Sequence, residues 1–341
     1  MVRAPRWFVV GAAVMLLVGP AAGRTLAGAL SAFAFAAEEG ERKAHTQDAL
    51  REPGPTLPFG RPQAVAQARS GTRRFYVATE TGLFASDDVG HRWDRLGVSP
   101  AGNADILAVA VDPLNEARLY IGGPGGLWQS EDGGTTWKTL FSPSLVRSTI
   151  RSIAIAPRVP KTLYVGTDQE GIFRSPDGAA SWIPASRGLP EALAGGRPAP
   201  IRSLAVDPTN PSIAYAGTEL HGLYKTTDAG ASWSAINRGL GLFPLQRRVG
   251  HPSLLINHDD PRQIMAMLVR PLHSRLVKTF LYQSADGGDH WFALEVELPP
   301  DAQGVALAED PADPQKVALF TTTGAIQIDW QKITGVEATR E

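Results

Sequence analysis

Five copies of one eight-residue pattern, Ser/Thr-x-Asp-x-Gly-x-x-Trp, constrain the fold of this chain more than any other feature. They start at Ser86, Ser130, Ser175, Thr226 and Ser284, so that successive copies begin 44 to 58 residues apart. An alternating run of β-branched and aromatic residues precedes each copy, and most repeats begin with a further apolar run that ends in an Asp-Pro or similar turn. A period of about 40 to 50 residues indicates a propeller or a solenoid.

Each repeat is predicted to form four antiparallel strands, in the order strand, Asp-Pro turn, strand, Gly-containing turn, strand, box, strand. Such a sheet has two apolar faces, and radial stacking of copies buries both. A sixth copy, residues 304–330, contains the first three strands and ends on Trp330 without a proper box. We therefore predict an all-β propeller of about six blades over residues 63–333. Seven blades, or a closing strand supplied by the segment before Gln63, remain open.

The box itself is predicted to be a structural turn. The Ser/Thr hydroxyl and the Asp carboxylate are two residues apart, a spacing at which both bond nearby backbone N–H groups. Gly supplies an unusual backbone angle, and the Trp ring is expected to be buried. A calcium loop would need a later glutamate and a 12-residue spacing. In the third copy Ala179 replaces the glycine, and Gly178 is expected to relieve the turn. The predicted box residues are Ser86, Asp88, Gly90, Trp93, Ser130, Asp132, Gly134, Trp137, Ser175, Asp177, Trp182, Thr226, Asp228, Gly230, Trp233, Ser284, Asp286, Gly288 and Trp291.

Composition excludes several classes of site. Lys plus Arg is 33 and Asp plus Glu is 34, so a net charge of −1 gives no global reason to expect a nucleic-acid partner. The absence of cysteine excludes disulfides, thiolate zinc sites and cysteine nucleophiles. No histidine pair has metal-ligand spacing, and there is no Gly-rich phosphate loop or nucleophile elbow. We expect no metal and no cofactor.

The N-terminus indicates export. Arg3 and Arg6 precede an apolar run over residues 7–18, followed by small residues that suit a signal peptidase. A second apolar run, residues 25–37, leaves open an uncleaved membrane anchor. We therefore assign 1–37 to a signal peptide or anchor, 38–62 to a linker and 334–341 to a tail. The expected location is periplasmic or extracellular, or attached to the membrane through the N-terminal segment.

The boxes, together with the pattern LYxGTxxGLYxSxDGGxxW and a preceding AVDPxxP, resemble the bacterial neuraminidase or Asp-box repeat. Over residues 63–333 the chain resembles propellers related to the photosystem II stability and assembly factor, within the sialidase-type propeller superfamily. This resemblance implies a propeller fold. It does not imply one function, because the repeat recurs in sialidases, xyloglucan-degrading enzymes, sorting receptors and assembly factors.

No catalytic residues are predicted. A sialidase-like enzyme needs an arginine cluster, a tyrosine nucleophile with a glutamate, and an aspartate acid/base. All six tyrosines, however, occupy repeat-strand positions explained by packing: Tyr76, Tyr120, Tyr164, Tyr215, Tyr224 and Tyr282. A two-carboxylate glycosidase remains an alternative, since a pair is recognised by its separation. The candidate carboxylates Glu80, Asp168, Glu170 and Glu219 lie in turns before the third strands, where we expect solvated side chains.

The irregular loops of the fourth and fifth repeats concentrate positive charge. Arginine suits bidentate recognition of carboxylates, so an acidic peptide or an anionic headgroup is the expected partner chemistry, with scattered solvated charge as the simpler interpretation. The predicted function is a non-catalytic, monomeric, exported propeller that binds a protein partner and helps a membrane or envelope complex assemble. A glycan-active or glycan-binding propeller is the alternative. The predicted partner-binding residues are Arg247, Arg248, His251, Arg270, His273, Arg275 and Lys278.

Overall fold

The structure is a computed structural model that describes residues 62–68, 74–87, 92–97, 105–140, 148–192, 196–241, 250–273, 276–296, 298–299, 302–309, 315–322 and 324–330. All of these residues belong to one compact unit, Thr46–Glu341. Within them no helix is long and apolar enough to cross a membrane. The predicted signal or anchor (1–37), the linker up to residue 61 and the tail (334–341) lie outside the described residues.

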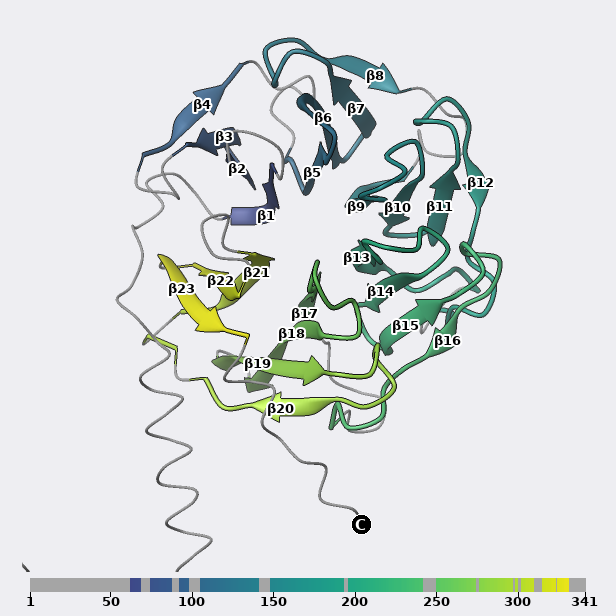
Figure 1. Ribbon diagram of the computed structural model, residues 1–341, viewed down its shortest axis with the longest axis vertical. Helices are drawn as coiled ribbons and strands as arrows, with labels where there is room; N and C mark the ends of the chain where they lie inside the picture. The colour runs from purple at the N-terminus through teal and green to yellow at the C-terminus, as the bar shows by residue number, and fades with distance from the viewer. Residues whose placement is uncertain are drawn as a thin grey trace, which may run out of the picture. The chain divides into compact units, whose positions relative to one another are not determined.

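The described strands form six antiparallel sheets, each built from consecutive strands and arranged around an axis as the blades of a propeller (Figure 1). Blade 1 contains β1 (Pro62–Gln67), β2 (Phe75–Thr79), β3 (Gly82–Ser86) and β4 (Asp94–Leu96). Blade 2 contains β5 (Ala108–Asp112), β6 (Asn115–Gly123), β7 (Gly126–Ser130) and β8 (Lys138–Leu140). Blade 3 contains β9 (Ile150–Ile155), β10 (Leu163–Thr167), β11 (Ile172–Ser175) and β12 (Ile183–Pro184).

Blade 4 contains β13 (Ile201–Val206), β14 (Ala214–Thr218), β15 (Gly222–Thr226) and β16 (Ser234–Ala235). Blade 5 contains β17 (Gly250–Ile256), β18 (Ile264–His273), β19 (Leu276–Ser284) and β20 (Phe292–Leu294). Blade 6 contains β21 (Gly304–Glu309), β22 (Lys316–Thr321) and β23 (Gly324–Asp329). The prediction of an all-β, six-bladed propeller is confirmed, and the sixth blade has the three strands expected for it within the described residues.

The first strand of each blade lies nearest the axis, and these inner strands form a ring (Figure 1). Each inner strand contacts the inner strands of its two neighbours, and β21 contacts β1, which closes the ring. The second and third strands lie between neighbouring blades, so β2, β10 and β14 are buried along their whole length. The outermost strands are short and exposed, and in blade 3 Pro184 removes a backbone donor from this edge.

Blade-to-blade packing depends on a glycine in the second strand of blades 2, 3 and 4. A methyl group added at Gly166 of β10 would lie 2.5 Å from Cγ2 of Ile201, the first residue of the next inner strand. Real carbon contacts are about 3.5 to 4.0 Å, so the glycine provides the space that the isoleucine fills. Gly122 meets Ile150, the first residue of β9, in the same way, and Gly217 meets Pro252, the third residue of β17.

The junction between blades 5 and 6 reverses this arrangement. Met267 of β18 occupies the position of the glycine, because it pairs with Ser253 as Gly217 pairs with Ser203, and the next inner strand begins with Gly304 instead of a large residue. A methyl group on Gly304 would collide with the sulfur of Met267. The small residue has therefore moved across the interface, which conserves the total volume at the junction.

The seam between blades 6 and 1 is closed by aromatic packing. Phe75 of β2 and Phe320 of β22 meet edge to face with ring centroids 5.6 Å apart. Ala306, Ala308 and Ala318 complete this core cluster, which joins the two ends of the repeat array. Such an aromatic pair contributes about 0.5 to 1.5 kcal/mol beyond the apolar area it buries.

We predict that Gly166→Ala lowers the free energy of unfolding by about 1 to 3 kcal/mol, because the added methyl group overpacks the blade 3–blade 4 interface. Chemical denaturation of a double-mutant cycle with Ile201→Ala measures the effect. In the Ile201→Ala background the loss caused by Gly166→Ala should shrink, since Cγ2 of Ile201, 2.5 Å from the added methyl group, is gone. Fully additive effects would contradict this packing.

Candidate functional site

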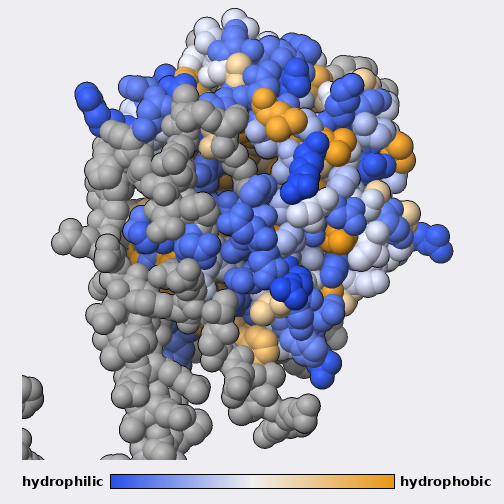
Figure 2. All heavy atoms as spheres, viewed as in Figure 1, coloured by the Kyte–Doolittle hydropathy of each residue, from blue (hydrophilic) through white to orange (hydrophobic). Residues whose placement is uncertain are grey.

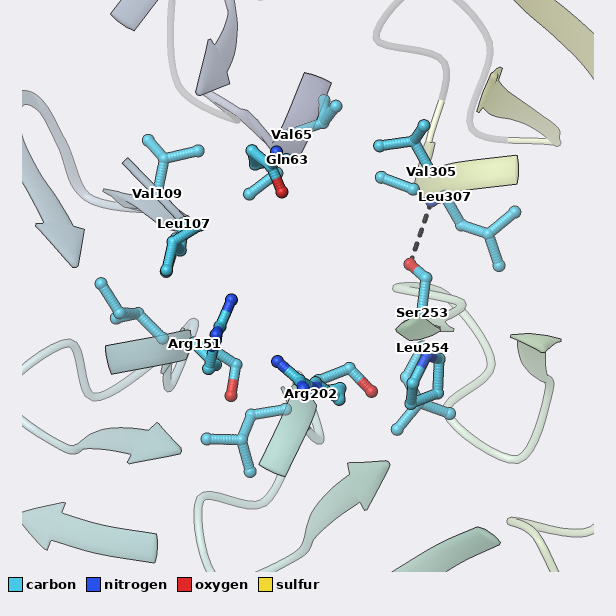
Figure 3. Close-up of a pocket in the computed structure, with 18 residues that line it drawn as sticks. Gln63, Val65, Leu107, Val109, Arg151, Arg202, Ser253, Leu254, Val305 and Leu307 are labelled. Carbon is cyan, nitrogen blue, oxygen red and sulfur yellow. Dashed lines mark hydrogen bonds between the residues drawn. The ribbon is translucent and has the colours of Figure 1, made fainter. Parts of the chain in front are cut away.

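A narrow cavity lies on the propeller axis at the end where the inner strands begin. Its volume is about 140 Å³, and residues from all six blades line it. Figure 3 shows the side chains that surround it. The walls are mostly Ala, Val, Leu, Ile and Pro, and the polar lining residues are Gln63, Arg151, Ser152, Arg202, Ser203 and Ser253.

Two arginines and two carboxylates form a chain at the mouth of this cavity. Nε of Arg151 donates to Oδ1 of Asp168 at 2.7 Å, and the same oxygen accepts from Nη1 of Arg202 at 3.3 Å. Nη2 of Arg202 donates to Oε2 of Glu219 at 2.6 Å. The side chain of Arg202 is only 14% exposed, and those of Asp168 and Glu219 are 20% exposed. The chain links blade 3 to blade 4 and has no net charge.

The repeat places these four side chains together. Arg151 and Arg202 are the second residues of β9 and β13, at equivalent positions beside the axis. Asp168 and Glu219 each follow the threonine that ends the second strand. That threonine shapes the turn, because the Oγ1 atoms of Thr167 and Thr218 donate to the carbonyl groups of the turn glycines at 2.9 Å. Each carboxylate is thereby held above the start of an inner strand.

The loop between blades 3 and 4 lies beside this chain. Its described residues, 189–192 and 196–200, form a small hairpin with a bridge between Glu191 and Pro198. Nη1 of Arg197 donates to Oε1 of Gln169 in the turn of blade 3. The backbone N–H of Glu219 donates to the carbonyl of Pro200 at 3.0 Å. The loop therefore borders the cavity mouth on the side of blades 3 and 4.

The four candidate carboxylates divide into two kinds. Glu80 and Glu170 are exposed, as expected for turn residues. Asp168 and Glu219 are instead ion-paired with Arg151 and Arg202, so the expectation of solvated side chains is wrong for this pair. Sequence reasoning missed both arginines. The sequence did contain a sign of them, because an arginine is the second residue of both IRSIAIAP and IRSLAVDP, the first strands of the third and fourth repeats.

The predicted basic patch is described only in part. Arg247, Arg248 and Arg275 lie outside the described residues. Arg270 and Lys278 pair across the β18–β19 hairpin, His273 lies near its end, and His251 lies at the start of β17. Nζ of Lys278 lies 5.3 Å from the ring centroid of Phe280. The hairpin continues past the position where the other blades turn, so these residues lie at the same end of the blade as the cavity mouth.

A second cavity, of about 180 Å³, occupies the opposite end of the axis. It shares Ile153, Leu204 and Leu254 with the first, so the two lie next to each other along the inner strands. Gln67 is the polar side chain among its lining residues. The charged side chains that line the two cavities, Arg151 and Arg202, therefore lie at one end of the axis. Among the described residues, no group of three or more His, Asp or Glu side chains is placed to hold a metal ion.

The box residues form turns at the far ends of the third strands, away from the mouth of the first cavity. In the second box the hydroxyl of Ser130 donates to Oδ1 of Asp132 at 2.8 Å and accepts from the N–H of Gly134 at 2.8 Å. The other oxygen of Asp132 accepts from the Thr136 hydroxyl at 2.5 Å. The boxes at Ser175, Thr226 and Ser284 repeat the Ser/Thr-to-Asp bond at 2.7 to 2.8 Å. Asp88 and Gly90 of the first box lie outside the described residues.

The turn needs two successive residues with positive φ. In the second box these are Gly133 and Gly134, at φ of 70° and 92°. In the third box Gly178 has a φ of 76° and Ala179 has a φ of 72°. The expectation that Gly178 relieves the turn is therefore wrong, because Ala179 itself adopts the strained conformation. Four side-chain hydrogen bonds to Ser175 and Asp177 hold the turn in this geometry.

Two of the box tryptophans join neighbouring blades. Nε1 of Trp233 donates to the carbonyl of Ala185 at 2.8 Å, and its backbone N–H donates to Arg187 at 2.9 Å. Trp291 repeats both bonds with Ile236 and Arg238. Trp233 and Trp291 are 3% and 2% exposed. Each ring thus anchors one blade to the outer strand of the blade before it.

Comparisons with known proteins identify the fold and no family. No protein-family model and no curated protein sequence matches the chain. An ancestral GH74 enzyme aligns with a TM-score of 0.57 and 20% identity, over 80% of this chain and 36% of that one. The GH74 xyloglucanase from Xanthomonas campestris aligns with a TM-score of 0.53 and 18% identity, over 84% of this chain and 55% of that one. The structure of YCF48 bound to D1 peptide aligns with a TM-score of 0.47 and 13% identity, over 86% of this chain and 97% of that one.

The chain thus spans between about a third and just over half of the length of the two GH74 structures. At identities of 20% and below, the two GH74 alignments show that the propeller fold is shared. They assign neither an activity nor a partner to this chain, because one fold hosts many functions.

We predict that Trp233→Ala lowers the free energy of unfolding by about 3 to 5 kcal/mol, because it removes a buried ring that joins two blades. Trp182→Ala is the matched control, since Trp182 ends the preceding box and is only partly buried. Chemical denaturation should show a smaller loss for Trp182→Ala. Equal losses would contradict the role assigned to Trp233 in joining the blades.

The boxes also predict a dependence of stability on pH. Hydrogen bonds from Thr136, Ser181 and Ser232 lower the pKa of Asp132, Asp177 and Asp228 to about 2. Because the folded-state pKa lies below the ordinary value, this stabilisation is present above pH of about 4 and is lost as the pH falls through about 2. Urea midpoints measured from pH 6 downwards should therefore fall over that window. In a variant with all three aspartates changed to Asn, the fall should be shallower. An unchanged slope would exclude the boxes as its source.

Proposed function

We propose that this chain is a non-catalytic, exported β-propeller that binds a protein partner through the face at the mouth of the first axial cavity, which we call the mouth face. The observation that carries the proposal is the ion-paired chain of Arg151, Asp168, Arg202 and Glu219 at the centre of this face. Its carboxylates are engaged by guanidinium groups, so they serve as structural acceptors.

The geometry argues against a glycosidase site here. A glycosidase uses two carboxyl groups that face one sugar ring, one as acid and one as base or nucleophile. Asp168 and Glu219 are both hydrogen-bonded to Arg202. No aromatic residue belongs to the described lining of the cavity to form a sugar platform. The volume of about 140 Å³ is also below the range of about 300 to 1,000 Å³ usual for ligand pockets.

The irregular parts of the repeat array gather on the mouth face. The loop over residues 189–192 and 196–200 borders the cavity at blades 3 and 4, and the long β18–β19 hairpin extends from blade 5. Loops on a rigid scaffold are where binding residues concentrate. Arg270 and Lys278 lie on this hairpin, and Arg247 and Arg248 precede β17. Guanidinium groups bind carboxylates in a bidentate manner, so an acidic segment of a protein is the partner chemistry that these residues favour.

The surface supports recognition by polar contacts. Hydrophilic side chains cover most of the face drawn in Figure 2, and hydrophobic side chains form small separate patches on it. Large contiguous apolar patches mark hydrophobic interfaces. For export, the support is the arginine-flanked apolar run over residues 7–18.

The proposal predicts that replacing Arg247, Arg248, Arg270 and Arg275 by Ser abolishes capture of one partner complex from a native envelope extract. The thermal melt should stay almost unchanged, because none of the four arginines belongs to a hydrophobic core cluster of the described residues. Quantitative affinity capture with the unaltered chain as reference measures the loss.

A matched control replaces Arg158, Lys161, Arg262 and Lys316 by Ser. These residues lie in or next to the turns that link first and second strands, at the other end of the blades. The control removes four positive charges and should still capture the partner. Intact capture by the first variant, or equal loss in both, would refute the proposed face. Recovery of no partner together with specific retention on a glycan array would favour the glycan-binding alternative.

A further inference from the structure

The axial cavity contains polar groups that have no partner in the described part of the chain. Arg151 uses its Nε for Asp168, and its two η nitrogens make no hydrogen bond with any described residue. The amide of Gln63 likewise has no described partner. Figure 3 shows both side chains reaching towards the axis from the inner strands β9 and β1. The cavity therefore offers guanidinium donors on one side and an amide donor and acceptor on the other.

The charge balance of the mouth disfavours a charged ligand. Arg151 and Arg202 carry two positive charges, and Asp168 and Glu219 carry two negative charges within hydrogen-bond distance. A carboxylate that enters the cavity loses its water and meets a cluster that is already neutral, so little Coulomb energy offsets its desolvation. An uncharged group with the same hydrogen-bonding capacity avoids most of this penalty.

The shape of the cavity selects a short group with an apolar stem and a polar head. Leu107, Val305 and Leu307 form an aliphatic wall beside the polar groups. A volume of about 140 Å³ admits one side chain and excludes a folded segment of backbone. A primary carboxamide has an oxygen that accepts from Nη of Arg151 and an NH₂ group that donates to Oε1 of Gln63.

We propose that the axial cavity binds the uncharged carboxamide side chain of an Asn or Gln residue. Its source is a partner polypeptide on the mouth face, so this inference rests on the proposed function. The carboxamide enters along the axis and bridges Arg151 and Gln63. This contact is separate from the basic loops, which bind the acidic part of the partner. It adds selectivity, because a site that pairs a polar group rejects an analogue unable to make the same bonds.

The test is a titration of the ¹⁵N-labelled full chain with propionamide, followed through the Nε–H resonance of Arg151. Loss of that resonance in Arg151→Lys assigns it. Propionamide should shift it saturably. Propionate has the same shape but carries a charge, and its affinity should be lower by a factor of about ten or more; a factor of ten corresponds to about 1.4 kcal/mol of binding free energy. Gln63→Leu should weaken propionamide binding by a similar factor. Arg197→Lys, on the loop outside the cavity, is the control and should bind as the unaltered chain does.

A second arm distinguishes a polypeptide from a free small amide. Acetyl-Gly-Gln-Gly-N-methylamide should shift the same resonance, and the peptide with Glu in place of Gln should do so more weakly. Propionate binding as tightly as propionamide, or no saturable shift with either amide, would overturn the inference. A shift with propionamide and none with the Gln peptide would overturn its polypeptide source. If envelope capture persists when the amide probes fail, the proposed function stands and the carboxamide site alone falls.

Discussion

The close approach of one blade to the next is the constraint on which the structure depends. In blades 2 to 4 a glycine in the second strand leaves space for a large residue near the start of the following inner strand. Because a neighbouring blade covers each face of a sheet, the apolar second and third strands are buried. Each blade therefore needs the two blades beside it to bury its apolar residues. At the reversed junction Met267 takes the glycine's place and Gly304 provides the space, so either side of the interface can carry the glycine.

The same packing builds the axial site. Inner strands that start at equivalent heights bring the second residue of each strand to one ring around the axis, so Arg151 and Arg202 become neighbours although they are far apart in sequence. The adjacent turns then provide Asp168 and Glu219 as counter-charges. Two partly buried guanidinium groups this close are tolerated because each has a carboxylate within hydrogen-bond distance. The site is thus polar and neutral, at the end of the axis where the inner strands begin.

The boxes act at the other end of the blades. Their aspartates accept up to three hydrogen bonds within a single turn, which accounts for pKa values near 2 and for the tolerance of Ala179 at a positive φ. Trp233 and Trp291 extend this local turn into contacts with the preceding blade. Turn formation and blade-to-blade anchoring are therefore carried by one short motif. This is why the motif identifies the architecture and carries no information about a ligand.

The sequence by itself determined the repeat, the four-stranded unit and the truncated last copy, because these follow from local periodicity and from turn residues that act within eight positions. It indicated about six blades, and the closed ring of inner strands in the structure decided that number. It also indicated the carboxylates Asp168 and Glu219 but assigned them to solvent. Only the tertiary structure decided that they pair with Arg151 and Arg202. Two of these pairs depend on the register of the first two strands within a blade, and the Arg202–Asp168 pair depends on the packing of blade 4 against blade 3. The conformation of Ala179 was likewise decided by the closed turn. Contacts between repeats are set by three-dimensional packing, which no local pattern in one repeat encodes.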